Sequence, residues 1–413
     1  MIKYHISKGD KSLSGDICLP FTKSISCRIL SFRALRSSKN EIKVLPHAEE
    51  VKTIDDTIAL KTNAQNHEFR QAIRYIRAFF NYFKGEWVIS GIEKSSNRPV
   101  ETTIKKLNKQ GVNVRFEERQ GYPPLKVVGK NLKGYFNRVE GIVSSEIINA
   151  SLYLNPTIHN SLVTELKDQV LKASYIEMSL KALHLLGVNT EWKDNEVLIE
   201  HTLKDNSDMT IEADWSAASY WYEVAAFSDN VDLSIQGLNS ESLQNDSVIR
   251  ELFENFGVKT HVSSHGIRLT KIRRKIKSFE YDFSHNPDIV QTMAVTCVVL
   301  KIPFRMKGIN SLRMKYTDRI KTLQSELSKL GATLTVEMED ENEVLCFNGK
   351  VSKRITRPIN ISTYEDHRIV MAFSPIAVTG IPVVVENPML TSKSYPAFWD
   401  DLKKTGFTIN QEL

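Results

Sequence analysis

Leu19-Pro20-Phe21-Thr22-Lys23-Ser24-Ile25-Ser26-Cys27-Arg28-Ile29-Leu30 is the stretch around which the fold is organised. Proline is expected to end an incoming strand, and apolar residues from Ile25 to Phe32 then recur with helical spacing. Lys23 falls in the first turn, where free backbone N–H groups and the helix dipole favour an anion, while Ser24 and Arg28 share one face. The stretch predicts a helix whose start can hold a phosphate or carboxylate. The alternative is a capped surface helix with solvated charges.

A second regularity is a helix-like segment that ends in glycine and leads into a strand-like segment. It recurs about every 75 residues, with its glycine at Gly111, Gly187, Gly257, Gly331 and Gly406. Each glycine is expected to be the left-handed residue that ends a helix. A polar turn and another strand follow. The period therefore predicts pseudo-symmetric α/β modules with mixed sheets covered by helices.

The first strand precedes the anion-binding helix, and a second polar crossing is expected near Glu212-Ala213-Asp214-Trp215. Two lobes joined by two crossings are the economical arrangement for such a chain. We therefore predict a discontinuous first lobe of residues 1–20 and 214–413, and a second lobe of residues 21–213.

Composition excludes several classes of protein. The 413 residues are 41% apolar and 25% charged, as in globular proteins. We expect a cytoplasmic protein without a membrane span, because no run of 18 apolar residues occurs and the N-terminus alternates like a strand. The four cysteines are scattered, so no metal site is expected. The net charge of +6 is too evenly spread for a nucleic-acid surface, and the basic run at 271–275 is expected to be a solvated strand end or loop.

Two later segments place charges at an expected helix start. The segment from Arg313 to Arg319 leads into an amphipathic helix, so its cations are expected at the mouth of that helix, outside the core. Asn286-Pro287-Asp288 opens an apolar helix, where Asp288 is either a cap or a base.

Two more segments follow the same pattern. Ser362-Thr363-Tyr364-Glu365-Asp366-His367-Arg368 holds two overlapping capping-box spacings, which explain its acids but leave Arg368 in a first turn unexplained. In Leu390-Thr391-Ser392-Lys393-Ser394-Tyr395-Pro396, hydroxyl residues again flank a lysine at an expected helix start. Cations at several helix starts predict a composite site for a small polyanion. Neither a GxxxxGK[ST] nor a GxGxxG motif is present, which argues against nucleotide binding by a glycine loop.

Nine segments, in family order from end to end, carry a resemblance to a known family. They are Thr22-Lys23-Ser24-Ile25-Ser26-Cys27-Arg28, Asn97-Arg98-Pro99, Val143-Ser144-Ser145-Glu146, Tyr175-Ile176-Glu177-Met178, Asp214-Trp215-Ser216-Ala217-Ala218-Ser219-Tyr220, Asn286-Pro287-Asp288, Lys315-Tyr316-Thr317-Asp318-Arg319, Asp366-His367-Arg368 and Thr391-Ser392-Lys393. Together they resemble the 3-phosphoshikimate 1-carboxyvinyltransferases, also called EPSP synthases. The resemblance implies an α/β fold of two lobes, each with three βαβαββ units around buried parallel helices.

The resemblance also implies a reaction. The 5-hydroxyl of shikimate 3-phosphate attacks C2 of phosphoenolpyruvate, a proton is added to the methylene carbon, and loss of phosphate leaves an enolpyruvyl ether. No metal or organic cofactor is implied, and the expected partners are these two small molecules. We expect no nucleic-acid or membrane partner and a monomeric protein.

Site residues carry over position by position. Shikimate 3-phosphate is expected to contact Lys23, Ser24, Arg28, Ser144, Ser145, Glu146, Tyr175, Asp288 and Lys315. Phosphoenolpyruvate is expected to contact Lys23, Arg98, Arg319, Arg368 and Lys393, since guanidinium forks match phosphate and carboxylate groups. The catalytic positions are Asp288 as general base, Lys23 and Lys393 as stabilisers of charge, and Tyr316.

Several positions depart from the family pattern. The family's glycine-threonine-alanine-methionine-arginine segment is here Arg70-Gln71-Ala72-Ile73-Arg74, so Arg70 stands where the backbone should approach the ligand. Tyr316 replaces a glutamate implicated in proton transfer, although a phenol is a poorer proton carrier at neutral pH. Glu146, Lys172 and Ser311 replace a glutamine, a serine and an asparagine. Two hypotheses stay open: an active, divergent EPSP synthase, or a weakened or inactive relative that still binds phosphorylated ligands.

Overall fold

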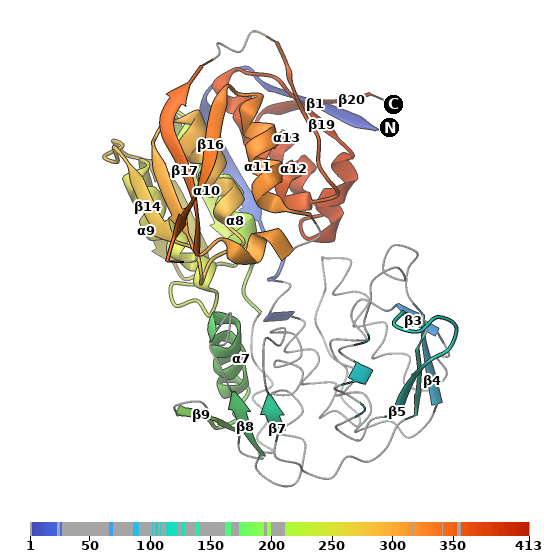
Figure 1. The fold of residues 1–413 in the computed structure, drawn as a ribbon. Coiled ribbons are helices and arrows are strands. Elements are labelled where there is room, and N and C mark those ends of the chain that lie inside the picture. Colours follow the sequence, from blue (N-terminus) through green and yellow to red (C-terminus); the bar gives the residue numbers. More distant parts are fainter. Residues whose placement is uncertain are drawn as a thin grey trace. The chain divides into compact units, whose positions relative to one another are not determined.

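The structure is a computed structural model that describes residues 2–22, 25–26, 66–68, 86–90, 101, 104–105, 108, 113–122, 125–128, 137–139, 162–166, 173–193, 196–199, 211–314, 317–340, 342–352 and 357–412 (Figure 1). The chain divides into two compact units. One consists of Met1–Thr22 with Glu212–Leu413, and the other of Lys23–Ile211.

The described residues of the first unit form three four-stranded sheets, with strand orders β18-β19-β1-β20, β12-β13-β11-β2 and β14-β15-β17-β16. The strands are β1 (Lys3–Lys8), β2 (Ser12–Cys18), β11 (Asn230–Gln236), β12 (Val258–Ser263), β13 (Gly266–Lys271), β14 (Phe279–Asp282), β15 (Phe304–Lys307), β16 (Ala332–Glu339), β17 (Asn342–Val351), β18 (Ile359–Ile361), β19 (Val383–Glu386) and β20 (Phe407–Glu412).

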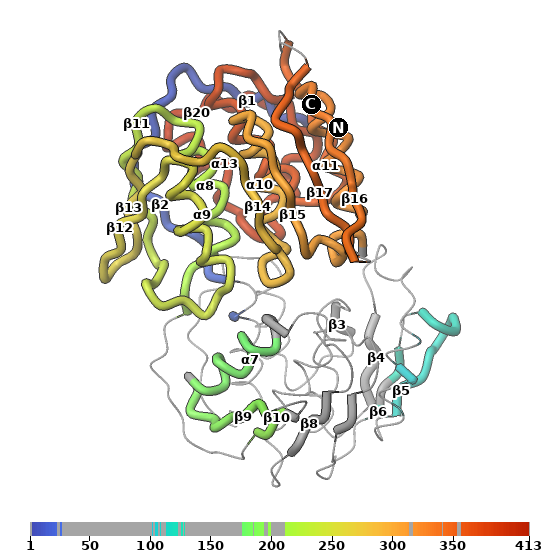
Figure 2. Tube along the Cα trace, turned by 60° about the vertical axis from the view of Figure 1, so that its left-hand side comes forward, coloured from blue at the N-terminus to red at the C-terminus, as the bar shows by residue number. Residues whose placement is uncertain are grey.

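The three sheets follow one plan. In each, two strands pair in parallel, and the other pairings are antiparallel. Parallel neighbours need a crossover connection, and in each sheet a helix lies between them in the chain. The sheet β18-β19-β1-β20 takes one strand from the other end of the chain, because β1 lies between β19 and β20 with Lys3 opposite Glu412. The two chain ends consequently lie side by side (Figure 2).

Helices pack inside this unit. They are α8 (Trp215–Phe227), α9 (Ile249–Asn255), α10 (Val290–Val299), α11 (Arg319–Ser328), α12 (His367–Phe373) and α13 (Phe398–Lys404), with 3₁₀ turns η2 (Asn245–Val248), η3 (Asn310–Met314), η4 (Ser374–Thr379) and η5 (Pro388–Lys393). The helices α8, α10 and α12 pack on one another and are almost wholly buried (Figure 1). A helix that is apolar all round belongs in a core, which explains why these three lie at the centre.

The glycines of the sequence repeat end helices as predicted. Gly187, Gly257, Gly331 and Gly406 have φ values of 81°, 92°, 82° and 89°, in the left-handed region. Each directly follows a helical segment and precedes a strand, so the reversal needs a residue without a Cβ atom. Gly111 lies outside the described residues.

The second unit contains two four-stranded sheets in its described part, with orders β3-β4-β6-β5 and β7-β8-β10-β9. The strands are β3 (Asn66–Glu68), β4 (Glu86–Ser90), β5 (Asn113–Phe116), β6 (Leu125–Val128), β7 (Asn137–Val139), β8 (Leu162–Leu166), β9 (Thr190–Lys193) and β10 (Glu196–Ile199), and α7 spans Ala173–Leu185. Both sheets repeat the plan of the first unit, with one parallel pair and otherwise antiparallel pairs. The predicted fold class, mixed sheets in repeated α/β modules with buried helices, is confirmed.

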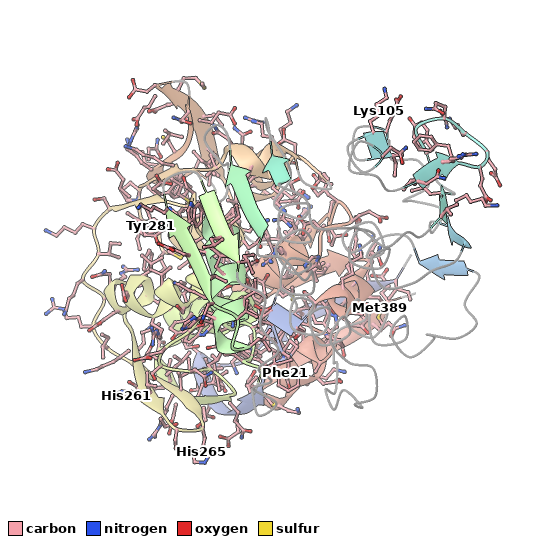
Figure 3. The ribbon with its side chains drawn as sticks, turned by 90° about the horizontal axis from the view of Figure 1, so that it is seen from below. Phe21, Lys105, His261, His265, Tyr281 and Met389 are labelled. Carbon is pink, nitrogen blue, oxygen red and sulfur yellow. The ribbon has the colours of Figure 1, made fainter. Side chains whose placement is uncertain are left out.

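Two passages of the chain pair where the first unit is interrupted. Phe21 forms an antiparallel bridge with Ala213, and the Asp214 N–H donates to the Pro20 carbonyl at 2.9 Å (Figure 3 labels Phe21). The Glu212 carboxylate accepts from the Trp215 indole N–H at 2.7 Å. Both passages are thereby fixed to the first unit immediately before α8 begins.

The basic run at 271–275 is the end of β13 and the loop after it. The expectation that it is solvated is wrong for Lys271, whose ammonium donates to the carbonyls of Ala225 and Ala226 at 3.0 and 2.8 Å. These carbonyls belong to the last turn of α8, where a cation complements the helix dipole.

No helix in the described ranges is long and apolar enough to cross a membrane.

Candidate active site

Four of the expected site residues lie in the described part of the first unit: Asp288, Arg319, Arg368 and Lys393. The others fall elsewhere. Lys23, Ser24, Arg28, Arg70, Arg98, Ser144, Ser145, Glu146, Lys172, Lys315 and Tyr316 lie outside the described residues, and Tyr175 is placed in α7 without a described side chain. The contacts described for Asp288, Arg319, Arg368 and Lys393 therefore lie within the first unit.

An aspartate stands at or just before the start of each central helix. Asp214 caps α8, with its carboxylate accepting from the N–H groups of Ser216 and Ala217 at 2.7 and 3.3 Å. Asp366 caps α12 by accepting from the Arg368 N–H at 2.9 Å. Asp288 precedes α10 by two residues. Repetition of the α/β module thus places an acid at equivalent points of the three repeats.

Asp288 does not cap its helix, so that half of the sequence expectation is wrong. The N-cap of α10 is Ile289, which makes no side-chain cap bond, and Pro287 lies in the turn before the helix. The Asp288 carboxylate instead meets two guanidinium groups, with Oδ1 at 3.4 Å from Arg319 Nη1 and Oδ2 at 3.2 Å from Arg368 Nη2. Its assignment as a base stays a prediction.

Arg319 is buried, which contradicts the expectation that the cations of its segment lie outside the core. Its side chain is 4% exposed and meets the Asp366 carboxylate, at 2.6 Å from Nε to Oδ2 and 3.4 Å from Nη2 to Oδ1. Burial of a charged group requires such pairing. Burial is the largest influence and raises the pKa of Asp366, but the charges of Arg319 and His367 and the hydrogen bonds from Arg319 and the Arg368 N–H together hold that pKa below its usual value.

Arg368 occupies the first turn of α12, a place that the helix dipole alone disfavours for a cation. Acidic neighbours explain its position. Burial opposes the charge, yet Asp288 and the neighbouring Tyr220, Asp214 and Asp246 raise the pKa of Arg368 above its ordinary value. Nη1 also donates to the Asp288 carbonyl at 3.1 Å. Arg368 is therefore a permanent cation tied to the loop before α10.

The two predicted capping boxes before α12 are wrong. The helix begins at His367. The residues before it form a turn in which the Asp366 N–H donates to the Thr363 carbonyl at 2.8 Å. Tyr364 and Glu365, the central residues of this turn, have φ values of 50° and 61°. The two acids that follow Ser362 and Thr363 by three residues therefore have other places. Glu365 is a central residue of the turn, and Asp366 is the N-cap of α12.

Lys393 does not start a helix either. It is the last residue of η5, and α13 begins only at Phe398. Its ammonium donates to the Glu365 carbonyl at 3.2 Å, which brings it to the turn before α12. The structure therefore joins Lys393, Arg319 and Arg368 through residues 365–368, and joins the two arginines through Asp288.

Asp246 is a neighbour that the sequence reasoning missed. It lies in η2, accepts from the Ser216 hydroxyl at 2.5 Å and lies 3.5 Å from the Asn286 amide nitrogen. Tyr281, labelled in Figure 3, donates to the Asn286 amide oxygen at 3.1 Å. Burial, aided by the charge of Asp288, raises the pKa of Asp246 to about 6. No spacing marks Asp246, because it stands in a polar loop like any surface acid.

Arg313 shortly precedes Lys315 and Tyr316 in the sequence, which lie outside the described residues. Its guanidinium contacts Asp318 at 2.8 Å and Glu343 at 2.6 Å, and Asp318 caps α11 by accepting from the Lys321 N–H at 3.1 Å. These contacts hold together Arg313 and Asp318, which flank the two residues in the sequence.

The arrangement can bind a small anion with more than one anionic group, because two guanidinium groups and one ammonium belong to a single network. A carboxylate between the guanidinium groups can accept a proton from a hydroxyl group. In the part of the chain that the structure describes, no group of three or more His, Cys, Asp or Glu side chains could hold a metal ion.

Comparison with known proteins identifies relatives along the whole chain. The family described as EPSP synthase (3-phosphoshikimate 1-carboxyvinyltransferase) matches residues 59–402. A 3-phosphoshikimate 1-carboxyvinyltransferase from Bacteroides fragilis is 34% identical over 413 residues, covering 98% of both chains. One from Vibrio atlanticus is 25% identical and covers 95% of this chain and 97% of its own.

Solved structures share the fold. An EPSP synthase from Acinetobacter baumannii matches with a TM-score of 0.78 at 18% identity, over 100% of both chains. The enolpyruvyl transferase NikO from Streptomyces tendae matches with a TM-score of 0.72 at 14% identity, over 99% of this chain and 98% of its own.

Proposed function

The chain belongs to the EPSP synthase (3-phosphoshikimate 1-carboxyvinyltransferase) family, and from this we propose that it transfers the enolpyruvyl group of phosphoenolpyruvate to the 5-hydroxyl of shikimate 3-phosphate and releases phosphate. The structural observation that carries the proposal is the placement of Asp288 against both Arg319 and Arg368. This arrangement puts an acceptor for a hydroxyl proton beside two cations that suit phosphoenolpyruvate.

In the proposed binding mode, Arg319, Arg368 and Lys393 hold the phosphate and carboxylate of phosphoenolpyruvate, together with Lys23 and Arg98. Arg319 and Arg368 suit this task because their pairing with acids fixes each guanidinium before the ligand arrives. Shikimate 3-phosphate binds to a set made up of Lys23, Ser24, Arg28, Ser144, Ser145, Glu146, Tyr175 and Lys315.

In the proposed reaction, Asp288 takes the proton of the 5-hydroxyl as the oxygen attacks C2 of phosphoenolpyruvate. The methylene carbon gains a proton, with Tyr316 at the position of the family's glutamate. Lys23 and Lys393 stabilise the charge of the tetrahedral intermediate. Deprotonation of the new methyl group and departure of phosphate then give the enolpyruvyl ether, so that atoms and charge balance.

The test is phosphate release from phosphoenolpyruvate by the purified protein, with and without shikimate 3-phosphate, and with the ether product identified by mass spectrometry. We expect release that depends on shikimate 3-phosphate. Release at the background rate, combined with calorimetric binding of shikimate 3-phosphate, would instead identify a binding protein that has lost turnover through positions such as Arg70 and Tyr316.

We further propose that the protein acts in the cytoplasm as a monomer and without a cofactor. Light scattering during gel filtration checks the mass, and turnover that persists after exhaustive chelation checks the independence from metal ions.

A further inference from the structure

The turn from Thr363 to Asp366 is unusual in its residues. The Asp366 N–H donates to the Thr363 carbonyl, and Tyr364 and Glu365 between them both have positive φ. Turns with positive φ at both central positions favour glycine, asparagine and aspartate, because other side chains are strained there. A tyrosine followed by a glutamate persists in this conformation only where surrounding contacts determine it.

Glu326, in the last turn of α11, supplies these contacts. Its side chain is 0% exposed. Oε1 accepts from the Tyr364 hydroxyl at 2.9 Å, and Oε2 accepts from the Ser362 N–H at 3.1 Å. Lys329 gives the buried carboxylate its counter-charge at 2.6 Å and also donates to the Asn360 carbonyl at 2.9 Å. One buried carboxylate thus holds the chain on the N-terminal side of the turn and the first of its strained residues.

The other side of the turn faces the candidate active site. The Glu365 carbonyl accepts from Lys393, and the Asp366 carboxylate receives Arg319 and the N–H of Arg368. Arg319 begins α11, the helix that also carries Glu326. The helix α11 therefore contacts the turn at two places, once through Arg319 of the candidate site and once through Glu326, which lies away from it.

We propose that Glu326 and Tyr364 are positioning residues, which hold the Thr363–Asp366 turn in its strained form so that Lys393, Arg319 and Arg368 are set for phosphoenolpyruvate. The proposal rests on the proposed function. It assigns Glu326 and Tyr364 no contact with either substrate. Their effect reaches the ligand through the carbonyl of Glu365 and the carboxylate of Asp366.

The test compares two substitutions of one residue. Tyr364→Phe removes the hydroxyl and leaves the strain, whereas Tyr364→Gly removes both, because glycine adopts positive φ freely. We expect Tyr364→Phe to raise KM for phosphoenolpyruvate about fivefold to twentyfold, since it loses a hydrogen bond to a charged group. KM for shikimate 3-phosphate should stay within about twofold, and Tyr364→Gly should raise KM for phosphoenolpyruvate less than Tyr364→Phe does.

Tyr222→Phe is the matched control. It also removes a tyrosine hydroxyl with a short hydrogen bond, to Thr260 at 2.7 Å. This control should change stability without changing either KM. If the Tyr364 side chain acts only by packing, we expect the reverse order, with KM for phosphoenolpyruvate raised more by Tyr364→Gly than by Tyr364→Phe. That order, or an equal change for both substrates, would overturn the proposal.

A readout that needs no turnover keeps the inference separate from the proposed function. Amide hydrogen exchange over residues 362–368 should accelerate in Tyr364→Phe and in Glu326→Gln, while exchange in α13 stays the same. If the wild-type protein shows no turnover but exchange over residues 362–368 is faster in the two variants, the proposed function is overturned and the positioning role of Glu326 and Tyr364 is supported. Active wild-type protein with unchanged exchange in both variants would overturn the hold alone.

Discussion

The guanidinium of Arg319 and the carboxylate of Asp366 form a buried pair, 2.6 Å from Nε to Oδ2, with side chains 4% and 1% exposed. Asp366 also caps α12, so one carboxylate serves a helix end and an arginine of the candidate site. Asparagine is as good a cap as aspartate but carries no charge. Asp366→Asn thus separates the two tasks.

We expect Asp366→Asn to destabilise the protein by about 2–4 kcal/mol, because the buried guanidinium loses its nearest counter-charge and keeps only the longer contact with Asp288. Denaturant unfolding monitored by fluorescence measures this change. Asp318→Asn is the control, because Asp318 also caps a helix and pairs with an arginine, but at 25% exposure. It should cost no more than about 1 kcal/mol. Equal losses in the two variants would contradict the importance of burial.

The same pair makes the free energy of unfolding depend on pH in the acidic range. The pKa of Asp366 is lowered in the folded protein, so its stabilising contribution is present above the pKa of an unfolded aspartate and is lost as pH falls through the lowered value. The unfolding free energy of the wild type should therefore decline in this acidic range more than that of Asp366→Asn. Parallel curves for the two proteins would show that the charge on Asp366 contributes nothing.

Asp288→Asn tests the proposed base. We expect kcat to fall by about 10²- to 10⁴-fold, the usual contribution of a positioned general base. Binding of shikimate 3-phosphate, measured by calorimetry, should persist. Asp282→Asn is the control, because Asp282 is an exposed acid whose carboxylate accepts from Ser284 in a turn. A kcat for Asp288→Asn within threefold of that control would exclude the assigned role.

The raised pKa of Asp246 gives stability a pH dependence of the opposite sign. Its pKa rises to about 6 in the folded protein from 3.8, so between these values the folded state binds more protons than the unfolded state. Stability then falls as pH rises through this window and stays lower above it. Asp246→Asn avoids the cost, and its amide oxygen can still accept from Ser216.

We expect Asp246→Asn to be more stable than wild type at pH 8, by roughly 1–2 kcal/mol given partial access to solvent. At pH 4 the difference should vanish. Urea unfolding at the two values measures both quantities, and Asp232→Asn, at an exposed acid paired with Arg268, serves as the control. Loss of stability in Asp246→Asn at pH 8 would refute the raised pKa.

Tyr316→Glu restores the residue type that the family has at this position. If proton transfer to the methylene carbon limits the reaction, we expect kcat to stay the same or to rise, because a carboxyl group carries protons better near neutral pH. Steady-state rates at pH 7 measure the effect, with Tyr222→Phe, a tyrosine variant in α8, as the control. A large loss of kcat in Tyr316→Glu would mean that tyrosine has acquired a role of its own.

The repeat could be predicted from sequence because its signal is local. A glycine that ends a helix follows from backbone sterics, and four such glycines have the expected left-handed conformation. The pairing of β1 with β20 could not be predicted in this way. It joins residues at opposite ends of the chain, and neither strand contains a signal that names its neighbour.

The site could be predicted in its residue types but not in its local geometry. Cations before or within helix starts indicated an anion site, and the structure places Arg319, Arg368 and Lys393 in one network. Sequence spacing failed at the turn before α12, because a capping box and a tight turn share the same residue types there. It also failed for the burial of Arg319, which depends on a partner 47 residues away.

The position of β1 has a consequence for how the protein is made. Of the strands that the structure describes, β1 is synthesised before all the others, whereas its neighbours β19 and β20 are synthesised after them. Until then both of its edges lack their final partners, and an unpaired strand edge can recruit other chains. A product cut short before β19 keeps that exposed edge permanently. Translation that stalls before β19 should therefore yield aggregates, whereas a chain that extends through β20 closes this sheet.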